Sequence, residues 1–113
     1  MKIVLAALFM LAAAAPTFAQ DEAALGAKCR RQARAFYQRN AGPSDIRRTF
    51  EFVKMLKAGD ELESFMGVRF GSFGKDLLLY TATGSYYSGW FIDAVLVDPV
   101  TCEAEKLVNI YSE

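Results

Sequence analysis

Two cysteines, Cys29 and Cys102, set the strongest constraint on how this chain can fold. With only two, a single intramolecular disulfide is possible, and it would close a loop across most of the sequence. Because a disulfide holds its two Cα atoms within roughly 7 Å, it would tie the start of the chain to its end. In the chain-entropy model, closing such a loop constrains the unfolded state by about 4 kcal/mol.

The N-terminal residues predict the compartment in which that bond would persist. Lys2 gives a positive start, the thirteen residues from Ile3 to Ala15 are all apolar, and Pro16 ends the run. This length is typical of the apolar core of a secretory signal peptide. A membrane-spanning helix needs roughly 20 apolar residues. The segment therefore indicates export and not a membrane anchor.

Small residues at Thr17 and Ala19 place signal cleavage after Ala19. We expect residues 1–19 to be a cleavable signal peptide and residues 20–113 to be one periplasmic or extracellular domain without a transmembrane segment. The alternative is an N-terminal core helix, but a core helix of this size normally carries a polar face, and this segment has none.

Export favours a structural disulfide between Cys29 and Cys102, because disulfides persist outside the reducing cytosol. The alternative is a redox pair or a nucleophilic thiol. The chain has no C-x-x-C spacing and no histidine to activate a thiolate. We therefore predict a structural bond.

The first part of the mature chain has a helical pattern. The run from Asp21 to Arg39 contains no proline, and acidic residues at its start suit the helix dipole. One helical face recurs at Leu25, Cys29, Ala33 and Phe36, and the opposite side carries Lys28, Arg31, Arg34 and Gln38. We expect the first face to be buried and the second to be exposed to water.

The next segment, Asp45 to Lys57, fits two patterns. Four apolar residues have helical spacing: Ile46, Phe50, Val53 and Leu56. Phe50-Glu51-Phe52 instead alternates as a strand does. Helical spacing is the more extensive of the two, so we predict a second helix here.

From Leu62 onward, short β-branched and aromatic runs are separated by glycines, which is typical of consecutive antiparallel strands. The predicted strands are Phe65–Phe70, Leu77–Thr83, Trp90–Val97 and Glu105–Tyr111. The sequence thus predicts an α+β domain in which one or two N-terminal helices pack on one face of an antiparallel sheet of about four strands.

The turn from Val97 to Glu103 resembles the closing hairpin of exported PepSY-type domains, although those hairpins usually carry a glycine where this chain has Cys102. The likeness covers roughly twenty residues, the turn and the strands beside it, and does not extend upstream. It implies a small extracytoplasmic regulatory or inhibitory module without catalytic residues.

Charge is distributed unevenly along the chain. The mature part has twelve basic and thirteen acidic residues, which argues against a nucleic-acid partner. Residues 20–57 carry nine Lys and Arg against four acids, whereas residues 58–113 carry three against nine. We expect mainly a solvated helix face beside an acidic sheet; the alternative is a basic helical face that meets an anionic surface such as lipid head groups or an acidic protein.

Catalytic motifs are sparse. The absence of histidine excludes Ser-His-Asp triads and most zinc sites, and no cofactor or metal site is predicted. Asp60, Glu61 and Glu63 cluster without the alternating spacing of a calcium loop, so a solvated acidic turn is favoured. Asp93 shares a strand face with apolar residues and would need a hydrogen-bond partner if that face is covered.

The aromatic cluster Phe73, Tyr86, Tyr87 and Trp90 is the candidate binding surface, because tyrosine and tryptophan in glycine-flanked loops are typical interface anchors. Core packing of these residues is the alternative. We predict a non-enzymatic binding or inhibitory module that acts on a macromolecule, such as a protein, in the cell envelope or outside the cell. A small carboxylate-dependent hydrolase and a structural envelope component are the other candidates.

Overall fold

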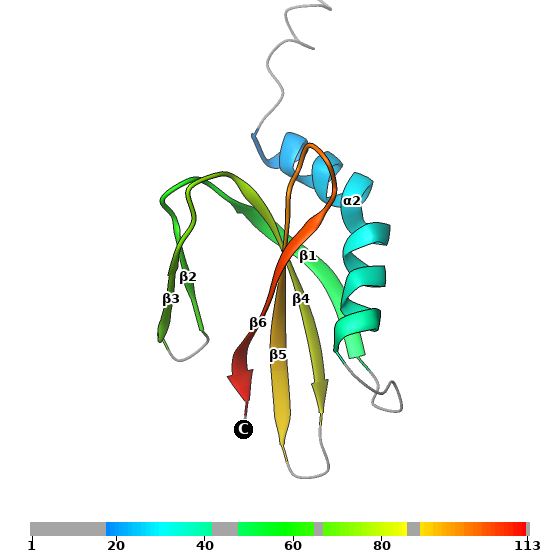
Figure 1. Cartoon of the computed structure of the whole chain (residues 1–113), viewed down its shortest axis with the longest axis vertical. Coiled ribbons are helices and arrows are strands. Elements are labelled where there is room, and N and C mark those ends of the chain that lie inside the picture. Colours follow the sequence, from blue (N-terminus) through cyan, green and yellow to red (C-terminus); the bar gives the residue numbers. More distant parts are fainter. Residues whose placement is uncertain (1–17, 42–47, 65–66, 86–88, 113) are drawn as a thin grey trace, which may run out of the picture.

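The computed structural model describes residues 18–41, 48–64, 67–85 and 89–112. One helix precedes six strands in this part of the chain (Figure 1). The elements are α2 (Phe18–Asn40), β1 (Arg48–Leu56), β2 (Glu61–Glu63), β3 (Arg69–Ser72), β4 (Leu77–Ser85), β5 (Trp90–Val97) and β6 (Ala104–Ser112). The predicted α+β class is confirmed.

The main sheet has four antiparallel strands in the order β1-β4-β5-β6. Helix α2 lies against one side of it, while β2 and β3 form a separate two-stranded hairpin on the other side (Figure 1). We call this hairpin the β2–β3 arm. Both sides of the main sheet therefore carry a layer, at least over part of their length.

Alternation along β4 and β5 explains why two core clusters form. Leu78, Tyr80 and Val95 point to the α2 side and join one buried cluster. Leu79 and Leu96, their neighbours along the strands, join a second cluster on the arm side. Because side chains of a strand alternate between faces, near-continuous apolar runs such as Leu77-Leu78-Leu79-Tyr80 supply both clusters at once.

Helix α2 presents the predicted faces. Cys29 and Ala33 are fully buried, and Leu25 and Phe36 pack at the edge of the same cluster. Lys28, Arg31, Arg34 and Gln38 are exposed. The helical periodicity of the sequence therefore gave the correct orientation of this element.

The predicted helix over Asp45–Lys57 is wrong, because residues 48–56 form strand β1 at the edge of the sheet. Phe50 and Phe52 alternate toward α2 and pack against the Tyr80 ring, with 5.4 Å between ring centroids in both pairs. A register shift between Phe52 and Lys54 then adds one residue to the strand. Pairing with β4, which would otherwise lack a neighbour on this side, outweighs the helical spacing.

The predicted strand over Phe65–Phe70 is displaced. The structure places β3 at Arg69–Ser72, and residues 65–66 lie outside the described part of the chain. Its partner β2, at Glu61–Glu63, was not predicted. Three residues are too few to show a clear alternation, so only the pairing with β3 defines this strand. The other three predicted strands are confirmed within two residues at each end.

A disulfide joins Cys29 of α2 to Cys102 in the β5–β6 turn, with 5.0 Å between the Cα atoms. The predicted pairing is therefore confirmed. Cys102 has a φ of 60°, and its N–H donates to the carbonyl of Asp98 at 2.9 Å. This is the left-handed conformation that usually favours glycine, so the cysteine adopts the backbone that the turn requires and also secures it to the helix.

Residues 1–17, most of the predicted signal peptide, lie outside the described part, and its last two residues belong to α2. Within the described residues, no helix is both long enough and apolar enough to cross a membrane.

Candidate functional site

Phe73 and Trp90, two of the four aromatic residues proposed as a binding surface, lie apart in the structure. Tyr86 and Tyr87 lie outside the described residues. Trp90 pairs with Ser85 at the far end of β4, whereas Phe73 lies four residues before the start of that strand. Eight residues of strand span about 26 Å at 3.3 Å each, so Phe73 and Trp90 are at opposite ends of the sheet.

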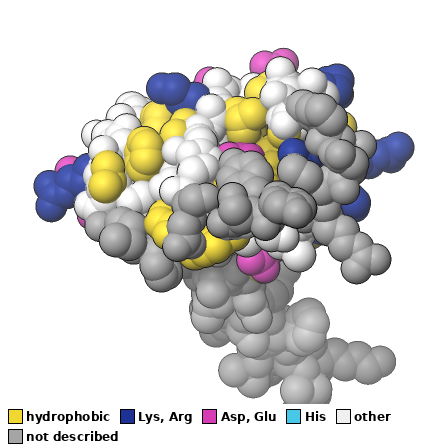
Figure 2. Space-filling model, turned by 90° about the horizontal axis from the view of Figure 1, so that it is seen from below, with side chains coloured by type: hydrophobic (Ala, Val, Ile, Leu, Met, Phe, Trp, Pro, Cys, Tyr) yellow, Lys and Arg dark blue, Asp and Glu magenta, His cyan; other side chains and the backbone are white. Residues whose placement is uncertain are grey.

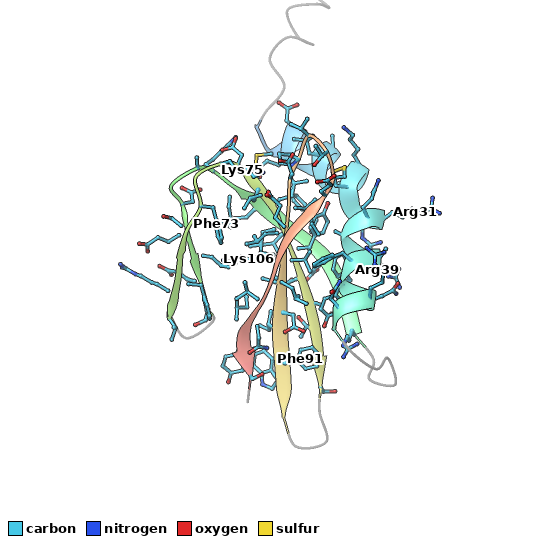
Figure 3. The ribbon with its side chains drawn as sticks, in the orientation of Figure 1. Arg31, Arg39, Phe73, Lys75, Phe91 and Lys106 are labelled. Carbon is cyan, nitrogen blue, oxygen red and sulfur yellow. A yellow bond between two sulfur atoms is a disulfide. The ribbon has the colours of Figure 1, made fainter. Side chains whose placement is uncertain are left out.

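Phe73 belongs to the arm side of the core. It packs against the second buried cluster, and Lys106 Nζ lies 5.6 Å from the centre of its ring. Figure 3 shows both side chains where the arm meets the sheet, far from Phe91 at the lower end. Phe73 thus serves the packing of the arm in this structure.

Trp90 has a different neighbour, which the sequence did not indicate. Its ring lies 4.4 Å from that of Tyr111, at an interplanar angle of 35°. Both side chains are half-buried, and neither belongs to either core cluster. We call these two residues the Trp90–Tyr111 pair. Among the described residues, this pair is the part of the predicted aromatic site that lies outside the core clusters.

The pair lies on the arm side of the sheet. Trp90 is two residues from Ile92, which packs on the second cluster, and Tyr111 is the registered partner of Ile92. Side chains two residues apart on a strand share a face. In Figure 2, which looks at this end of the molecule, hydrophobic side chains are visible at several places, and most Lys and Arg side chains lie at the rim.

Asp93 has the partner that a covered aspartate needs. The Tyr37 hydroxyl of α2 donates to Asp93 Oδ2 at 2.7 Å, and Asn109 Nδ2 of β6 donates to Oδ1 at 2.9 Å. Both carboxylate oxygens are therefore occupied by hydrogen bonds that join the helix to two strands. This geometry is that of a structural carboxylate on the α2 side.

The acidic residues near β2 are also engaged in local contacts. Asp60 Oδ2 accepts a hydrogen bond from the Lys57 N–H at 3.0 Å. Glu61 and Glu63 form ion pairs with Arg69 across the arm, at 3.2 and 3.8 Å. The sheet separates them from Asp93, so the structure does not bring these carboxylates into one site. Among the described residues, no group of three or more Asp, Glu or Cys is arranged to hold a metal ion.

Arg48, which the sequence placed in a helix, is held by aromatic rings. Its guanidinium carbon lies 5.5 Å from the ring centres of both Tyr37 and Phe91. One of its terminal nitrogens donates to the Ala41 carbonyl at 3.4 Å, while Nε is buried without a hydrogen-bond partner among the described residues. The arrangement fixes the first residue of β1 against α2 and β5.

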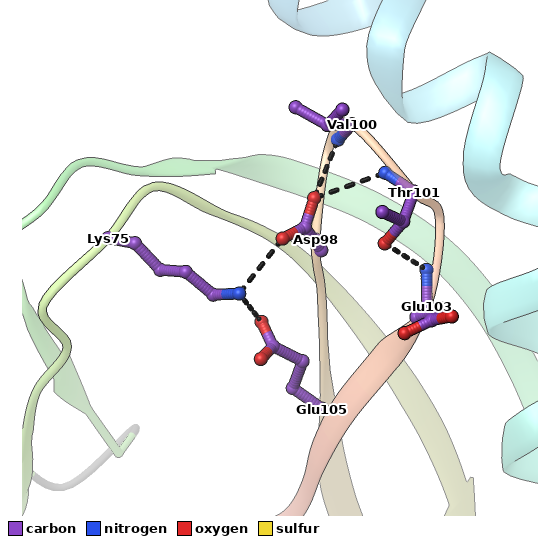
Figure 4. A network of polar contacts seen from close by, with 6 residues as sticks. All are labelled: Lys75, Asp98, Val100, Thr101, Glu103 and Glu105. Carbon is purple, nitrogen blue, oxygen red and sulfur yellow. Dashed lines mark hydrogen bonds and ion pairs between the residues drawn. The ribbon is translucent and has the colours of Figure 1, made fainter.

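A polar network joins the arm side to the β5–β6 turn (Figure 4). Lys75 Nζ contacts Asp98 Oδ2 at 2.9 Å and Glu105 Oε2 at 2.6 Å. Asp98 Oδ1 also accepts hydrogen bonds from the N–H groups of Val100 and Thr101. The bond from Lys75, followed by those from the two backbone groups, lowers the pKa of Asp98 to about 2. Bonds to Glu105 and then to Asp98 raise the pKa of Lys75.

The outer side of α2 has a shallow, basic groove. It has a volume of about 490 Å³ and is lined by Ala27, Arg30, Arg31, Arg34, Ala35 and Gln38. Arg31 lies on the side of α2 that faces away from the sheet (Figure 3), whereas Arg39 lies at the flank of the helix, where it lines a pocket with Cys102 and Glu103 of the β5–β6 turn. Arg30 differs from the others, because its terminal nitrogen donates to the Phe50 carbonyl at 2.9 Å and holds α2 against β1.

Comparison of the chain with protein-family models, with curated proteins and with solved structures finds no match. The candidate surfaces are therefore defined by their own geometry.

Proposed function

We propose that this chain is an exported, non-enzymatic binding module that acts on a macromolecular partner in the cell envelope or outside the cell. The observation that carries the proposal is the Trp90–Tyr111 pair. Trp90 is the only tryptophan of the chain, yet it is half-buried and lies outside both core clusters. An aromatic side chain that lies outside the core clusters is suited to anchor a partner.

The arrangement of the pair supports this role. The contact between the two rings restricts the indole before a partner arrives, and fewer rotamers are then lost on binding. The pair also lies beside the β4–β5 connection, whose sequence contributes Tyr86 and Tyr87. Export is supported by the apolar N-terminal sequence and is compatible with the disulfide between Cys29 and Cys102.

The hydrolase alternative finds less support. It needs two carboxylates that face one cleft, whereas Asp93 is hydrogen-bonded through both oxygens on the α2 side and Asp60 and Glu61 lie near the arm. Asp93→Asn should therefore affect stability and not a catalytic rate. A structural envelope component remains the third candidate, and it predicts no loss of a specific partner when the Trp90–Tyr111 pair is altered.

Trp90→Ala tests the binding proposal. A partner is first captured from an envelope or culture-supernatant extract with the wild-type protein, and its affinity is then measured for each variant. We expect Trp90→Ala to weaken binding by about 2 kcal/mol or more, roughly 30-fold, with thermal stability nearly unchanged. Because the Trp90 side chain lies outside both core clusters, we expect stability to be retained.

Two control variants show what to expect from the loss of an exposed ring and of a buried ring. Phe70→Ala removes a ring that is 39% exposed on the arm and should leave both binding and stability close to wild type. Phe91→Ala removes the buried ring of the residue that follows Trp90 in the sequence, and it should destabilise the fold by about 3–5 kcal/mol. If Trp90→Ala lowers stability as much as Phe91→Ala does, the indole stabilises the fold and the proposed anchor is wrong.

A further inference from the structure

Helix α2 carries cations whose charge the described structure does not neutralise. Lys28, Arg31, Arg34 and Arg39 are exposed, and none of them forms an ion pair within the described residues. The ion pairs that are present join the arm, the β1–β2 turn and the β5–β6 turn. From Ala23 to Asn40 the helix contains no acidic residue. We call Lys28, Arg31, Arg34 and Arg39 the cationic stripe.

The stripe has a simple geometry. At 100° per residue, its members fall within an arc of about 140° opposite the buried face of Cys29 and Ala33. Lys28 and Arg39 are separated by about 16 Å along the helix axis at 1.5 Å per residue. The shallow groove on this side of the helix is lined by Arg31 and Arg34 together with the small side chains of Ala27 and Ala35. Four cations can therefore approach one flat surface together.

The chemistry of this face distinguishes a membrane from a protein partner. A protein interface usually buries aromatic or large aliphatic anchors at its centre. Besides the stripe, the exposed residues of α2 from Ala23 to Asn40 are alanine, glutamine, arginine and asparagine, with no large apolar side chain, and exposed Asp21 lies at the start of the helix. Adsorption to an anionic bilayer needs only cations at the surface, each worth a factor of about five in binding.

We propose that the outer face of α2 binds the surface of an anionic phospholipid bilayer through the cationic stripe. The rest of the charge distribution agrees with this orientation. Residues 58–113, which form the arm and most of the sheet, carry nine acids against three basic residues. An anionic surface would repel that side and attract α2, so the molecule would adsorb in one orientation.

The test is co-sedimentation of the full chain with vesicles of pure phosphatidylglycerol or pure phosphatidylcholine. We expect binding to the first and not to the second, with loss of binding at about 1 M salt, where charges are screened beyond roughly 3 Å. Arg31→Gln/Arg34→Gln should weaken vesicle binding roughly 25-fold. Lys28→Gln/Arg39→Gln tests the same stripe with a second pair of exposed residues.

Lys54→Gln/Arg69→Gln is the matched control, since it removes the same charge from β1 and the arm. If it weakens binding as much as the stripe variants do, net charge is responsible and the proposal is overturned. Retention on a polyglutamate resin through Arg31 and Arg34, without vesicle binding, would overturn it in favour of an acidic protein. Absence of binding to both also refutes it. The stripe is separate from the Trp90–Tyr111 pair, so either proposal can fail alone.

Discussion

Gly26→Ala should destabilise this protein, although alanine is the better helix former. Gly26 lies in the buried face of α2, and a Cβ at this position would come within 2.5 Å of two ring carbons of Phe52. Ordinary carbon–carbon contacts lie at about 3.5–4.0 Å, so α2 or the Phe52 side chain must shift by roughly 1 Å. Overpacking of this kind usually costs about 1–3 kcal/mol.

The same movement disturbs a buried hydrogen bond. The Tyr80 hydroxyl donates to the Gly26 carbonyl at 2.6 Å, and burial raises the pKa of Tyr80 to about 12. Lengthening this bond adds up to about 1–2 kcal/mol, because a buried hydroxyl without a partner is unfavourable. The gain from helix propensity is about 1 kcal/mol. The expected net loss is therefore about 2 kcal/mol.

Urea unfolding with the disulfide intact measures this loss. We expect a lower midpoint with an unchanged m-value, and a decrease in Tm of about 8–16 °C. Gly74→Ala is the matched control, since no atom lies within 4 Å of the added Cβ and φ is not positive. It should change stability by less than about 0.5 kcal/mol.

Phe52→Leu relieves the contact, so the double variant Gly26→Ala/Phe52→Leu should be more stable than the sum of the single changes predicts. The reasoning is refuted if Gly26→Ala is as stable as the wild type. That result would mean that helix and sheet do not need the close approach that glycine allows.

Two further predictions concern the links to the β5–β6 turn. Replacing both Cys29 and Cys102 with alanine should destabilise the domain by about 2–5 kcal/mol, measured by urea unfolding against oxidised wild type; an equal midpoint would show that the bond does not stabilise the fold. Lys75 and two backbone N–H groups lower the pKa of Asp98 from 3.8 to about 2. The ionised carboxylate therefore contributes fully to the free energy of unfolding above pH 4, and this contribution is lost as the pH falls through 2. Thermal unfolding between pH 4 and pH 2 should consequently depend less on pH in Lys75→Gln than in the wild type, and parallel profiles would contradict this assignment.

The sequence was sufficient where a local pattern also determines the tertiary contact. The spacing of Leu25, Cys29 and Ala33 gives the buried side of α2 whatever packs on it, and with two cysteines in the chain Cys29 has one possible intramolecular partner. The glycine-separated runs gave three strands of the sheet for the same reason. Each contains enough residues for its composition to identify it.

The sequence pattern was insufficient where contacts between residues far apart in the chain determine the structure. Residues 48–56 contain both helical and strand spacing, and only the pairing with β4 selects the strand. The partners of Asp93 and Trp90, which are Tyr37 and Tyr111, lie on other elements of the fold. Phe73 and Trp90 flank the same strand in sequence, yet its length places them at opposite ends of the sheet.

The positions of the two proposed surfaces have a consequence for how they can operate. The cationic stripe faces away from the sheet on the α2 side, and the Trp90–Tyr111 pair lies with Ile92 on the arm side. The Cys29–Cys102 disulfide and the Tyr37–Asp93 hydrogen bond connect the helix to the sheet between them. Because these links hold the two layers together, adsorption through α2, as proposed, would leave the aromatic pair on the side away from the bilayer. A protein bound in this way can hold a second macromolecule at a membrane surface without either contact displacing the other.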